Sequence, residues 1–304
     1  MIHFKDVTKT FKPDFFSQEF KALDSVNFEV PEGSMVGFLG ANGAGKTTSL
    51  KIIMDFIRPS NGHVTFGTKL GVNKLEIFKN IGFLPERPYF YPNLTGDEFL
   101  HFMGKLSEVP VNQIKQEINK WAPRFKIDHA LKRELKTYSK GMLQRIGFLA
   151  TILHHPQLII LDEPISGLDP IGRKELKDVI IEVHKEGKTV FFSSHIVPDV
   201  EEICDRVIFL KEGKLVYDGP VNTLLSSGMN QDYILTLQTS GEPTFLSLFK
   251  KRIDLPENMY RFIVTSSMKD AFLKEAIEKK VNIVSLEMVK PSLEEIFYHA
   301  QEQK

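Results

Sequence analysis

A glycine-rich stretch that carries a lysine and two threonines is the part of the sequence best suited to chemistry. It fits the pattern G-x-x-x-x-G-K-[ST] and reads Gly40, Ala41, Asn42, Gly43, Ala44, Gly45, Lys46, Thr47 and Thr48. The glycines let successive backbone N–H groups turn toward phosphate oxygens. Lys46 would neutralise the terminal phosphates, and the Thr47 hydroxyl would be a ligand for Mg²⁺. The stretch therefore predicts a site for a nucleoside triphosphate.

Two carboxylates and a histidine follow two apolar runs further along the chain. Asp162 and Glu163 come directly after the run 158–161, and His195 ends the segment 189–195. Carboxylates at the carboxyl end of a buried strand are costly unless a cation or a reaction uses them. A lone histidine is usually structural, but a histidine at a strand end beside such a carboxylate is a candidate catalytic residue.

The segments on both sides of the glycine-rich stretch are those that a phosphate-binding loop needs. Residues 35–39 form an apolar run typical of a buried strand, and Leu50, Ile53, Met54 and Ile57 share one helical face. The free N–H groups at the start of that helix add partial positive charge beside the loop. Strand, loop and helix in this order favour an α/β core.

The N-terminal segment reads as short strands, at 2–7 and 21–30, with an aromatic-rich stretch at 11–16 between them. Two interpretations of these aromatics stay open: a ring that stacks on a flat adenine, or a packed loop. Phe11 is the best candidate for the adenine contact.

The middle of the chain predicts a helical insertion over about 87–155. Prolines at 85, 88 and 92 indicate an irregular connector over 81–92. Thr95 and Glu98 have the spacing of a capping box, which begins a helix. Near the end of the insertion, Ser139 is a plausible N-cap of another helix.

The pattern changes after about residue 222, and we expect one domain over 1–221 and a second over 222–304. In the second, residues 233–237, 261–265 and 281–289 read as strands, and 245–251, 269–280 and the segment from Pro291 as helices. It contains no titratable cluster that indicates a site. We interpret it as a regulatory or packing module.

Composition narrows the functional classes. Among 304 residues, Lys+Arg and Asp+Glu each number 39, so no global charge favours nucleic acid as a partner. The N-terminus lacks the apolar core of a signal peptide, and no run of about 18 apolar residues would span a bilayer. The single cysteine, Cys204, excludes an internal disulfide and fits a reducing cytosol.

Taken in order, these motifs resemble the ATP-binding subunit of an ABC transporter over roughly the first 220 residues. Residues 40–48 match the Walker A loop, 138–142 the signature, 158–163 the Walker B strand and 166–169 the D-loop. Glu86 stands at the Q-loop position and His195 at that of the switch histidine. The signature variant and the segment 291–297 further resemble the branch that exports drugs, sodium or lipids.

The resemblance implies a fold and a set of roles. The fold is a P-loop NTPase (RecA-like) α/β core with an antiparallel β subdomain, a helical insertion and a small C-terminal α+β domain. Thr47, Glu86 and Asp162 would bind Mg²⁺, Glu163 would orient the attacking water, and His195 would contact the γ-phosphate of ATP. The residues expected to act on the nucleotide of a second subunit are Ser139, Lys140, Gly141, Met142 and Asp169.

This sequence departs from the family pattern at three of these positions. Lys140 and Met142 replace a glycine and a glutamine, and Glu86 replaces a glutamine. A carboxylate can bind Mg²⁺ at least as well as an amide, but it adds negative charge beside a triphosphate.

The resemblance also implies partners: a second ATP-binding subunit, identical or different, and one or more transmembrane permease subunits. We therefore expect an ATPase that powers export and lies on the cytoplasmic face of the membrane through its permease. Residues Tyr89, Phe90 and Tyr91 could be a docking surface for the permease or could pack inside the insertion.

The sequence leaves three alternatives to an ABC transporter subunit. A soluble ABC-type ATPase acting on ribosomes or DNA usually has two cassettes or a long coiled coil, and this chain has neither pattern. A GTPase or small-molecule kinase is the second alternative, and residues 73–76 are only a weak match to a guanine-reading motif. An interaction module without activity would not need Glu163.

Overall fold

The protein was examined as a computed structural model, which describes residues 1–12, 19–227, 232–239, 252–288 and 293. Its contacts divide the chain into two compact units, Met1–Val221 and Asn222–Lys304. Each unit is described by itself.

The first unit contains nine strands and seven α-helices in its described residues, and an eighth helix begins at its last residue, Val221. Its strands are β1 (Ile2–Phe11), β2 (Phe20–Val30), β3 (Met35–Leu39), β4 (Asn61–Phe66), β5 (Ile81–Leu84), β6 (Leu158–Asp162), β7 (Thr189–Ser194), β8 (Arg206–Lys211) and β9 (Lys214–Pro220). Its helices are α1 (Lys46–Ile53), α2 (Lys74–Lys79), α3 (Gly96–Leu106), α4 (Val111–Trp121), α5 (Lys140–Ile152), α6 (Pro170–Lys185), α7 (Val197–Ile203) and α8 (Val221–Ser227). Short 3-10 turns lie at Thr68–Leu70, Asp128–Ala130 and Leu135–Thr137.

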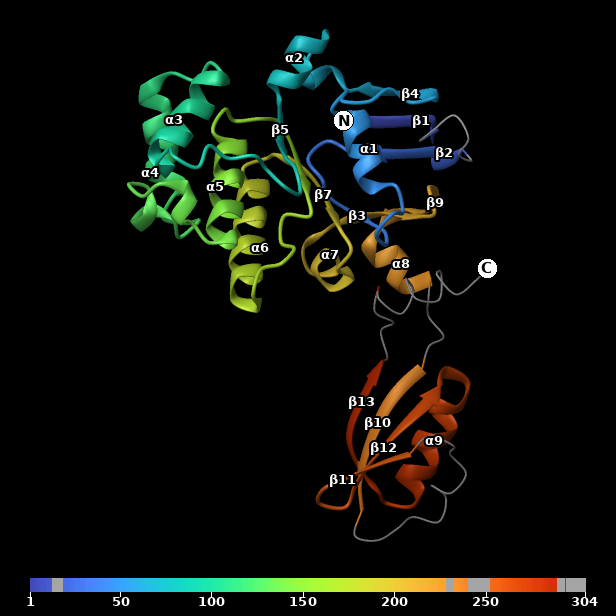
Figure 1. The fold of residues 1–304 in the computed structure, drawn as a ribbon. Helices are drawn as coiled ribbons and strands as arrows, with labels where there is room; N and C mark the ends of the chain where they lie inside the picture. The colour runs from blue at the N-terminus through green and yellow to red at the C-terminus, as the bar shows by residue number, and fades with distance from the viewer. Residues whose placement is uncertain (13–18, 228–231, 240–251, 289–292, 294–304) are drawn as a thin grey trace. The chain divides into compact units, whose positions relative to one another are not determined.

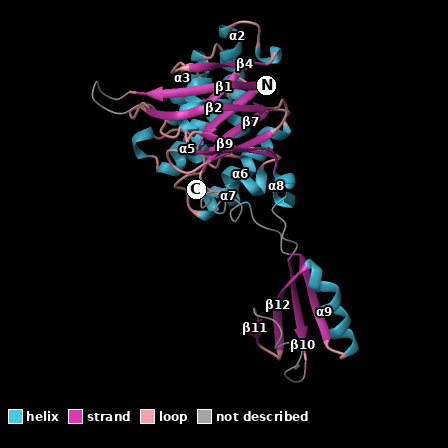
Figure 2. Cartoon of the chain, turned by 90° about the vertical axis from the view of Figure 1, so that its right-hand side faces the viewer, coloured by secondary structure: helices cyan, strands magenta, loops and turns pink. Residues whose placement is uncertain are grey.

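Two sheets build this unit. The larger has the order β5-β6-β7-β3-β8-β9, with β5, β6, β7, β3 and β8 parallel and β9 antiparallel to β8. Every residue of β3, β6 and β7 is buried, as expected for the centre of a parallel sheet. The smaller sheet is antiparallel with the order β2-β1-β4, and Figure 2 shows β1 and β2 side by side on one face of the unit.

Aromatic side chains pack the two sheets together. Phe28 of β2 stacks on Phe4 of β1 with ring centroids 4.2 Å apart. The same ring lies 5.6 Å from Phe38 of β3 and 6.2 Å from Phe191 of β7. These buried rings fix the antiparallel sheet against the parallel one, and so hold β2 near the loop that follows β3.

Helices α3, α4 and α5 gather on one side of the unit, away from β1, β2 and β4 (Figure 1). They fall within the expected insertion 87–155. The capping box at the start of α3 is confirmed, because Thr95 and Glu98 bond each other's backbone N–H groups. Ser139 is confirmed as the N-cap of α5, since its side chain accepts a hydrogen bond from the Met142 N–H.

The expectation of an irregular connector over 81–92 was wrong for its first four residues. Residues 81–84 form β5, which pairs with β6 in parallel. The first proline of the segment, Pro85, comes after the strand has ended, so it removes no hydrogen bond from the ladder.

The second unit contains an antiparallel sheet with the order β11-β12-β10-β13, made of β10 (Asp232–Gln238), β11 (Arg252–Leu255), β12 (Met259–Thr265) and β13 (Asn282–Met288). Helix α9 (Ser266–Glu278) covers one face through buried contacts that include Phe262 and Phe272. Strand β11 was not expected. The predicted helix 245–251 lies outside the described residues, as does the predicted last helix except for residue 293.

Candidate nucleotide site

The glycine-rich loop connects the buried end of β3 to the first turn of α1. Gly43 and Gly45 have φ angles of 84° and 106°, which are strained for residues with a side chain. A Cβ on Gly45 would also lie 2.7 Å from the Ala22 carbonyl oxygen of β2. The loop therefore needs glycine at position 45 for its backbone angle and for its packing.

Lys46 is held across the loop by backbone carbonyls. Its side chain is 6% exposed, and its Nζ donates to the carbonyl oxygen of Gly40 at 2.6 Å. The same Nζ lies 3.5 Å from Oε1 of Glu163. Burial lowers the pKa of Lys46, and the negative charge of Glu163 opposes this shift. A phosphate group would supply further negative charge, which would stabilise the protonated form of this buried lysine.

Asp162 ends the central strand β6 and is almost completely buried, with 3% of its surface exposed. Burial raises the pKa of its carboxyl, and a hydrogen bond from Ser193 opposes this shift. The Ser193 Oγ lies 2.5 Å from Asp162 Oδ1 and also accepts the backbone N–H of Glu163 at 2.9 Å. The Ser193 hydroxyl thus fixes the side chain of Asp162 and the backbone of Glu163.

Ser193 was not among the residues selected from the sequence. It is the cross-strand neighbour of Asp162 in the parallel pair β6 and β7. Its position two residues before His195, at the end of an apolar run, was the available signal. Only the strand register shows that its hydroxyl meets the carboxylates.

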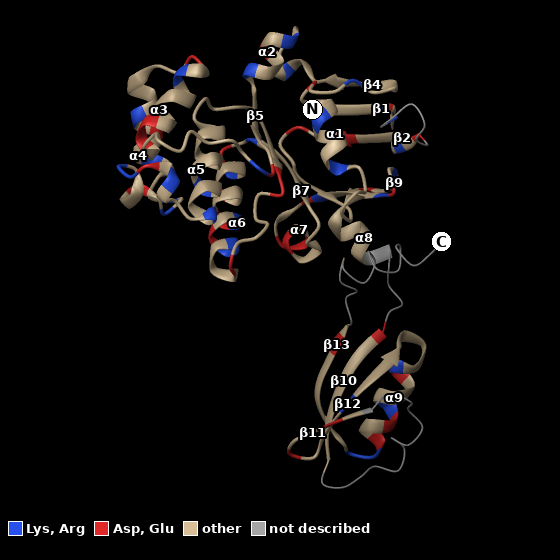
Figure 3. Ribbon diagram, in the orientation of Figure 1, with Lys and Arg blue, Asp and Glu red and all other residues tan. Residues whose placement is uncertain are grey.

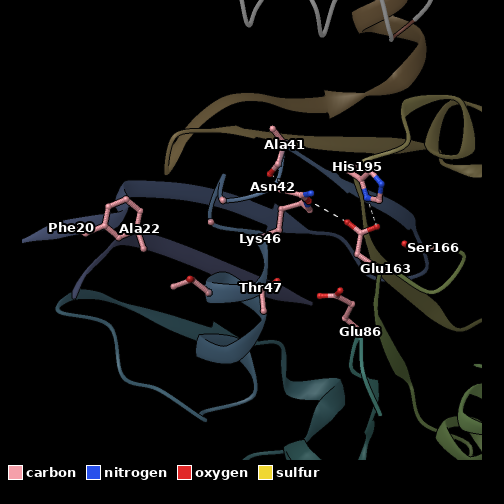
Figure 4. A pocket seen from close by; sticks show the side chains of 13 residues that line it. Phe20, Ala22, Ala41, Asn42, Lys46, Thr47, Glu86, Glu163, Ser166 and His195 are labelled. Atoms are coloured by element: carbon pink, nitrogen blue, oxygen red, sulfur yellow. Dashed lines mark hydrogen bonds and ion pairs between the residues drawn. The ribbon is translucent and has the colours of Figure 1, made fainter. Parts of the chain in front are cut away.

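Glu163 and His195 form a hydrogen-bonded pair at the adjacent ends of β6 and β7. Nδ1 of His195 lies 2.8 Å from Oε2 of Glu163, whose side chain is 10% exposed. Glu163 has a φ angle of 51°, in the left-handed region that side chains other than glycine rarely adopt. Strain of this kind, about 1–3 kcal/mol, is typical of functional sites. Figure 4 shows the Glu163 carboxylate between Lys46 and His195.

These groups open into a cavity of about 470 Å³. The structure brings most of the predicted residues together there. Its lining is Phe20, Ala22, Ala41, Asn42, Gly43, Gly45, Lys46, Thr47, Thr48, Glu86, Glu163, Ser166 and His195. The cavity therefore joins the phosphate loop to the ends of three parallel strands, because Glu86 follows β5 by two residues (Figure 4).

The residues expected to bind Mg²⁺ have the right chemistry. Thr47 and Glu86 line the cavity, and the Asp162 carboxylate is buried next to it with an electrostatic effect on Lys46. The described residues contain no cluster of three or more His, Cys, Asp or Glu side chains that would enclose a metal by themselves. Mg²⁺ usually takes one or two protein carboxylates together with phosphate oxygens and water, so this oxygen donor set fits it.

Phe11, the residue predicted to contact adenine, does not line the cavity. The aromatic residue there is Phe20, the cross-strand partner of Phe11. β2 is an edge strand whose residues Ala22 and Leu23 touch the phosphate loop, whereas β1 is the central strand of its sheet. The Phe11 ring instead lies 5.0 Å from the Lys9 amine. The other aromatics of this stretch, Phe15 and Phe16, lie outside the described residues.

The residues expected to act on a second subunit lie away from the cavity. Its lining contains none of Ser139, Lys140, Gly141, Met142 and Asp169. Ser139 and Lys140 are exposed, and the Asp169 side chain caps α6 by accepting the Gly172 N–H at 3.2 Å. A single copy therefore presents Ser139, Lys140 and Asp169 to solvent rather than to its own loop.

The aromatic cluster at 89–91 is divided between surface and interior. Tyr89 is 80% exposed and Tyr91 is 44% exposed, whereas Phe90 packs against Phe99 with ring centroids 5.4 Å apart. Tyr89 and Phe90 both line a second cavity of about 310 Å³ between the core and the insertion. The packing interpretation holds for Phe90, and Tyr89 is available to a partner.

Residues 73–76, the weak match to a guanine-reading motif, begin a helix. The Asn73 side chain caps α2 by accepting the Glu76 N–H at 3.0 Å, and Glu76 accepts the Val72 N–H at 2.9 Å. These contacts account for both side chains as helix caps. None of the four residues lines the nucleotide cavity.

Comparison with known proteins gives consistent matches. The family described as ABC transporter matches residues 23–166. An uncharacterized ABC transporter ATP-binding protein of Synechocystis is 34% identical over 297 residues, covering 96% of this chain and 82% of that protein. A bacitracin transport ATP-binding protein of Bacillus licheniformis is 34% identical over 285 residues, covering 91% of each chain.

Solved structures with the same fold include the ATP-binding subunit of an ABC transporter. That chain superposes with a TM-score of 0.65 and 26% identity, covering 75% of this chain and 92% of that chain. A dimeric ATP-binding cassette in a post-hydrolysis state with ADP and Pi superposes with a TM-score of 0.65 at 23% identity, covering 73% and 99%. At that identity the second likeness concerns the fold.

Proposed function

The chain belongs to the family of ABC transporter ATP-binding proteins and is an ATPase, and we propose that it powers export through a membrane permease by ATP-driven pairing of two ATP-binding subunits. The observation that supports this proposal most directly is the incomplete cavity. The phosphate loop, Glu163 and His195 line it, while the signature residues 139–142 and the D-loop residue Asp169 of the same copy do not. A second copy would close the open side with those residues.

The phosphate loop and the residues beside it, Glu86, Asp162, Glu163, Ser193 and His195, are called the loop side of the site. The loop side would bind ATP and orient the attacking water. The backbone N–H groups of the loop and Lys46 would hold the phosphates, and the ring of Phe20 would stack on the adenine. Thr47, Glu86 and Asp162 would hold Mg²⁺, which neutralises charge on the transferred phosphoryl group when bound. Glu163 would accept a hydrogen bond from the attacking water, and His195 would orient that carboxylate and the water.

The geometry of Glu163 suits this role. Its carboxylate oxygens already contact two cationic or potentially cationic side chains, Lys46 at 3.5 Å and His195 at 2.8 Å. Its backbone N–H donates to the Ser193 hydroxyl, and its side chain lines the cavity. Such preorganised groups typically contribute factors of about 10²–10³ to the rate.

A membrane partner follows from the family rather than from this chain's own helices. None of the helices within the described residues is long and apolar enough to cross a membrane. One relative is named for bacitracin transport, and one structure with this fold is part of the transporter complex cbiONQ. We therefore place the chain on the cytoplasmic face of the membrane, with Tyr89 and its cavity as the permease contact.

The proposed direction of transport rests on a resemblance in sequence. The signature variant that begins at Tyr138 and the sequence of residues 291–297 resemble the drug, sodium and lipid exporters. The relative named for bacitracin transport is compatible with that branch. Export is therefore part of the proposal. The soluble ABC-type ATPase with a non-transport partner is the alternative that the comparisons do not favour.

The proposal is tested by replacing Glu163 with Gln. We expect turnover to fall about 10²–10³-fold with ATP binding retained, so that an ATP-bound pair accumulates. Size-exclusion chromatography with light scattering in ATP and Mg²⁺ measures the pair. The double variant Glu163→Gln, Lys46→Ala is the control, because without ATP binding it should stay single. A Glu163→Gln protein that remains single while the wild type hydrolyses ATP would show that pairing is not part of the cycle.

A further inference from the structure

Residues 139–142 and 167–169 do not line the cavity. The two segments contact each other and form one surface. We call this surface the complementary face. The Lys140 side chain runs across Gly167, with its Nζ only 2.2 Å from where a Cβ would be. A Cβ on Gly141 would lie 3.3 Å from Cδ2 of Leu168. Segments about 25 residues apart in the sequence are thus packed side by side.

An ion pair between α5 and α6 lies directly behind the complementary face. Nη2 of Arg145 lies 2.5 Å from Oε2 of Glu175, and the two side chains are 15% and 22% exposed. Nη1 of Arg145 donates to the Phe125 carbonyl oxygen at 3.0 Å. Lys126 binds the other oxygen of Glu175 at 2.6 Å. The planar guanidinium therefore links the insertion to α6 with a defined geometry.

Only the first two turns of α5 and of α6 separate this ion pair from the complementary face, and hydrogen bonds fix the start of each helix. Arg145 lies six residues after Ser139, the N-cap of α5, and Glu175 lies six residues after Asp169, the N-cap of α6. Gly172 lies between them: a Cβ there would be 2.7 Å from Asp169 Oδ1 and 3.6 Å from Arg145 Nη2. Arg173 adds a hydrogen bond of 3.0 Å from its Nε to the Leu168 carbonyl oxygen.

Two further ion pairs join α6 to the same region but differ in burial. Arg124 pairs with Glu182 at 2.7 Å, and Lys120 pairs with Glu186 at 2.5 Å. Their side chains are 34–42% exposed, about twice the values at Arg145 and Glu175. Exposed pairs of this kind typically contribute about 0–1 kcal/mol. Figure 3 shows charged residues of both signs on α4 and α6, whereas those of α5 are basic.

We infer that Arg145 and Glu175 are positioning residues that hold the complementary face as one rigid unit and therefore act on the ATP site of the other copy. This inference rests on the proposed function, because it needs two copies that complete each other's sites. Neither residue lines the cavity of its own copy. Without the ion pair, α5 could shift against α6, and a displacement of about 1 Å at reacting groups can cost about 10²-fold in rate.

The test uses mixed pairs of two copies with different affinity tags, purified through both tags in ATP. One copy carries Glu163→Gln, which silences the site on its own loop. The remaining site combines the loop of the intact copy with the complementary face of the Glu163→Gln copy. Glu175→Gln is then placed on either copy, and the ATPase rate is measured together with the ATP affinity.

We expect turnover to fall about 10-fold when Glu175→Gln is on the Glu163→Gln copy and less than about 2-fold when it is on the intact copy. Arg145→Lys, which keeps the charge but loses the fork, should show the same asymmetry with a smaller fall. Glu182→Gln is the matched control and should change neither arrangement. ATP affinity of the intact loop should stay the same throughout.

Equal falls in both arrangements would overturn the inference, because a merely structural ion pair has no preferred copy. No fall in either arrangement would overturn it as well. The proposed function fails differently: Glu163→Gln alone would then form no ATP-dependent pair, before any change at Glu175 is introduced.

Discussion

The loop side of the ATP site and the complementary face satisfy their polar groups in different ways. On the loop side, Lys46 and Asp162 are 6% and 3% exposed, and each is bonded within the same copy. On the complementary face, Ser139 and Lys140 are exposed, and the polar contacts of Ser139 and Asp169 are with their own helices.

This difference predicts that ATP binding and ATP hydrolysis depend on different parts of the molecule. The loop side has its charges desolvated and positioned before a phosphate arrives, so it should bind ATP without a partner. The complementary face is well fixed but faces away from the cavity of its own copy. We therefore expect substitutions on the loop side to change ATP affinity in a single copy, and substitutions on the complementary face to change only the activity of the pair.

The largest expected effect contrasts Lys46→Ala with Ser139→Ala. Removing Lys46 should weaken ATP binding to single copies by about 100-fold or more, because hydrogen bonds to charged groups contribute about 1.5–3 kcal/mol each. Ser139→Ala should leave that affinity within about 2-fold. Titration with a fluorescent ATP analogue at dilutions below pairing measures both.

Lys51→Ala, an exposed lysine on the same helix α1, is the control for a general loss of positive charge. If Ser139→Ala weakened ATP binding to single copies as strongly as Lys46→Ala, the division between the two sides would be wrong.

An intermediate effect is expected for Ser193→Ala on the loop side. This change removes the hydroxyl that bonds the Asp162 carboxylate and the Glu163 N–H, so kcat should fall about 10–100-fold, as for the loss of one hydrogen bond to a charged group. ATP affinity should change little. Steady-state ATPase assays over a range of Mg²⁺ concentrations measure this.

Thr151→Val is the matched control, because it removes a buried hydroxyl that bonds only the Gly147 carbonyl oxygen. Thermal unfolding of both variants shows whether stability changes equally. An equal loss of kcat in the two variants would mean that Ser193 has no special role at the site.

The smallest expected effect distinguishes Phe20 from Phe11. Loss of a stacked ring costs about 1 kcal/mol, so Phe20→Ala should weaken ATP binding about 5-fold, while Phe11→Ala should leave it within about 2-fold. Binding of ATP and of inorganic triphosphate to single copies is compared. A specific role in adenine contact requires that the triphosphate affinity stay unchanged. The reverse ranking of the two phenylalanines would favour Phe11 as the adenine contact.

The motifs that are local in the sequence could be predicted well. The phosphate loop at 40–48, the N-cap Ser139 and the capping box at Thr95 each depend on residues within a few positions of one another. Local backbone geometry and hydrogen bonding determine such features, so a single sequence contains the necessary information. The apolar runs of β6 and β7 were recognised for the same reason, because burial on both faces leaves a continuous hydrophobic pattern.

Contacts between distant segments depended on the tertiary structure. The order β5-β6-β7-β3 brings Glu86, Asp162, Glu163 and Ser193 together, although they come from three separate parts of the chain. Ser193 meets Asp162 only because the register of β6 against β7 pairs them. Phe20 replaces Phe11 beside the loop because β2 and not β1 is the strand next to it, and the sequence pattern of the two strands does not decide which is the edge.

The sequence by itself determined the chemistry of this protein: a phosphate loop, two carboxylates and a histidine in the order of one ATPase family. The tertiary structure decided which side chains share a cavity and which face away from it. The physical reason is that residue type and local spacing fix what a group can bind, whereas strand register and helix packing, which depend on the whole core, fix what it meets.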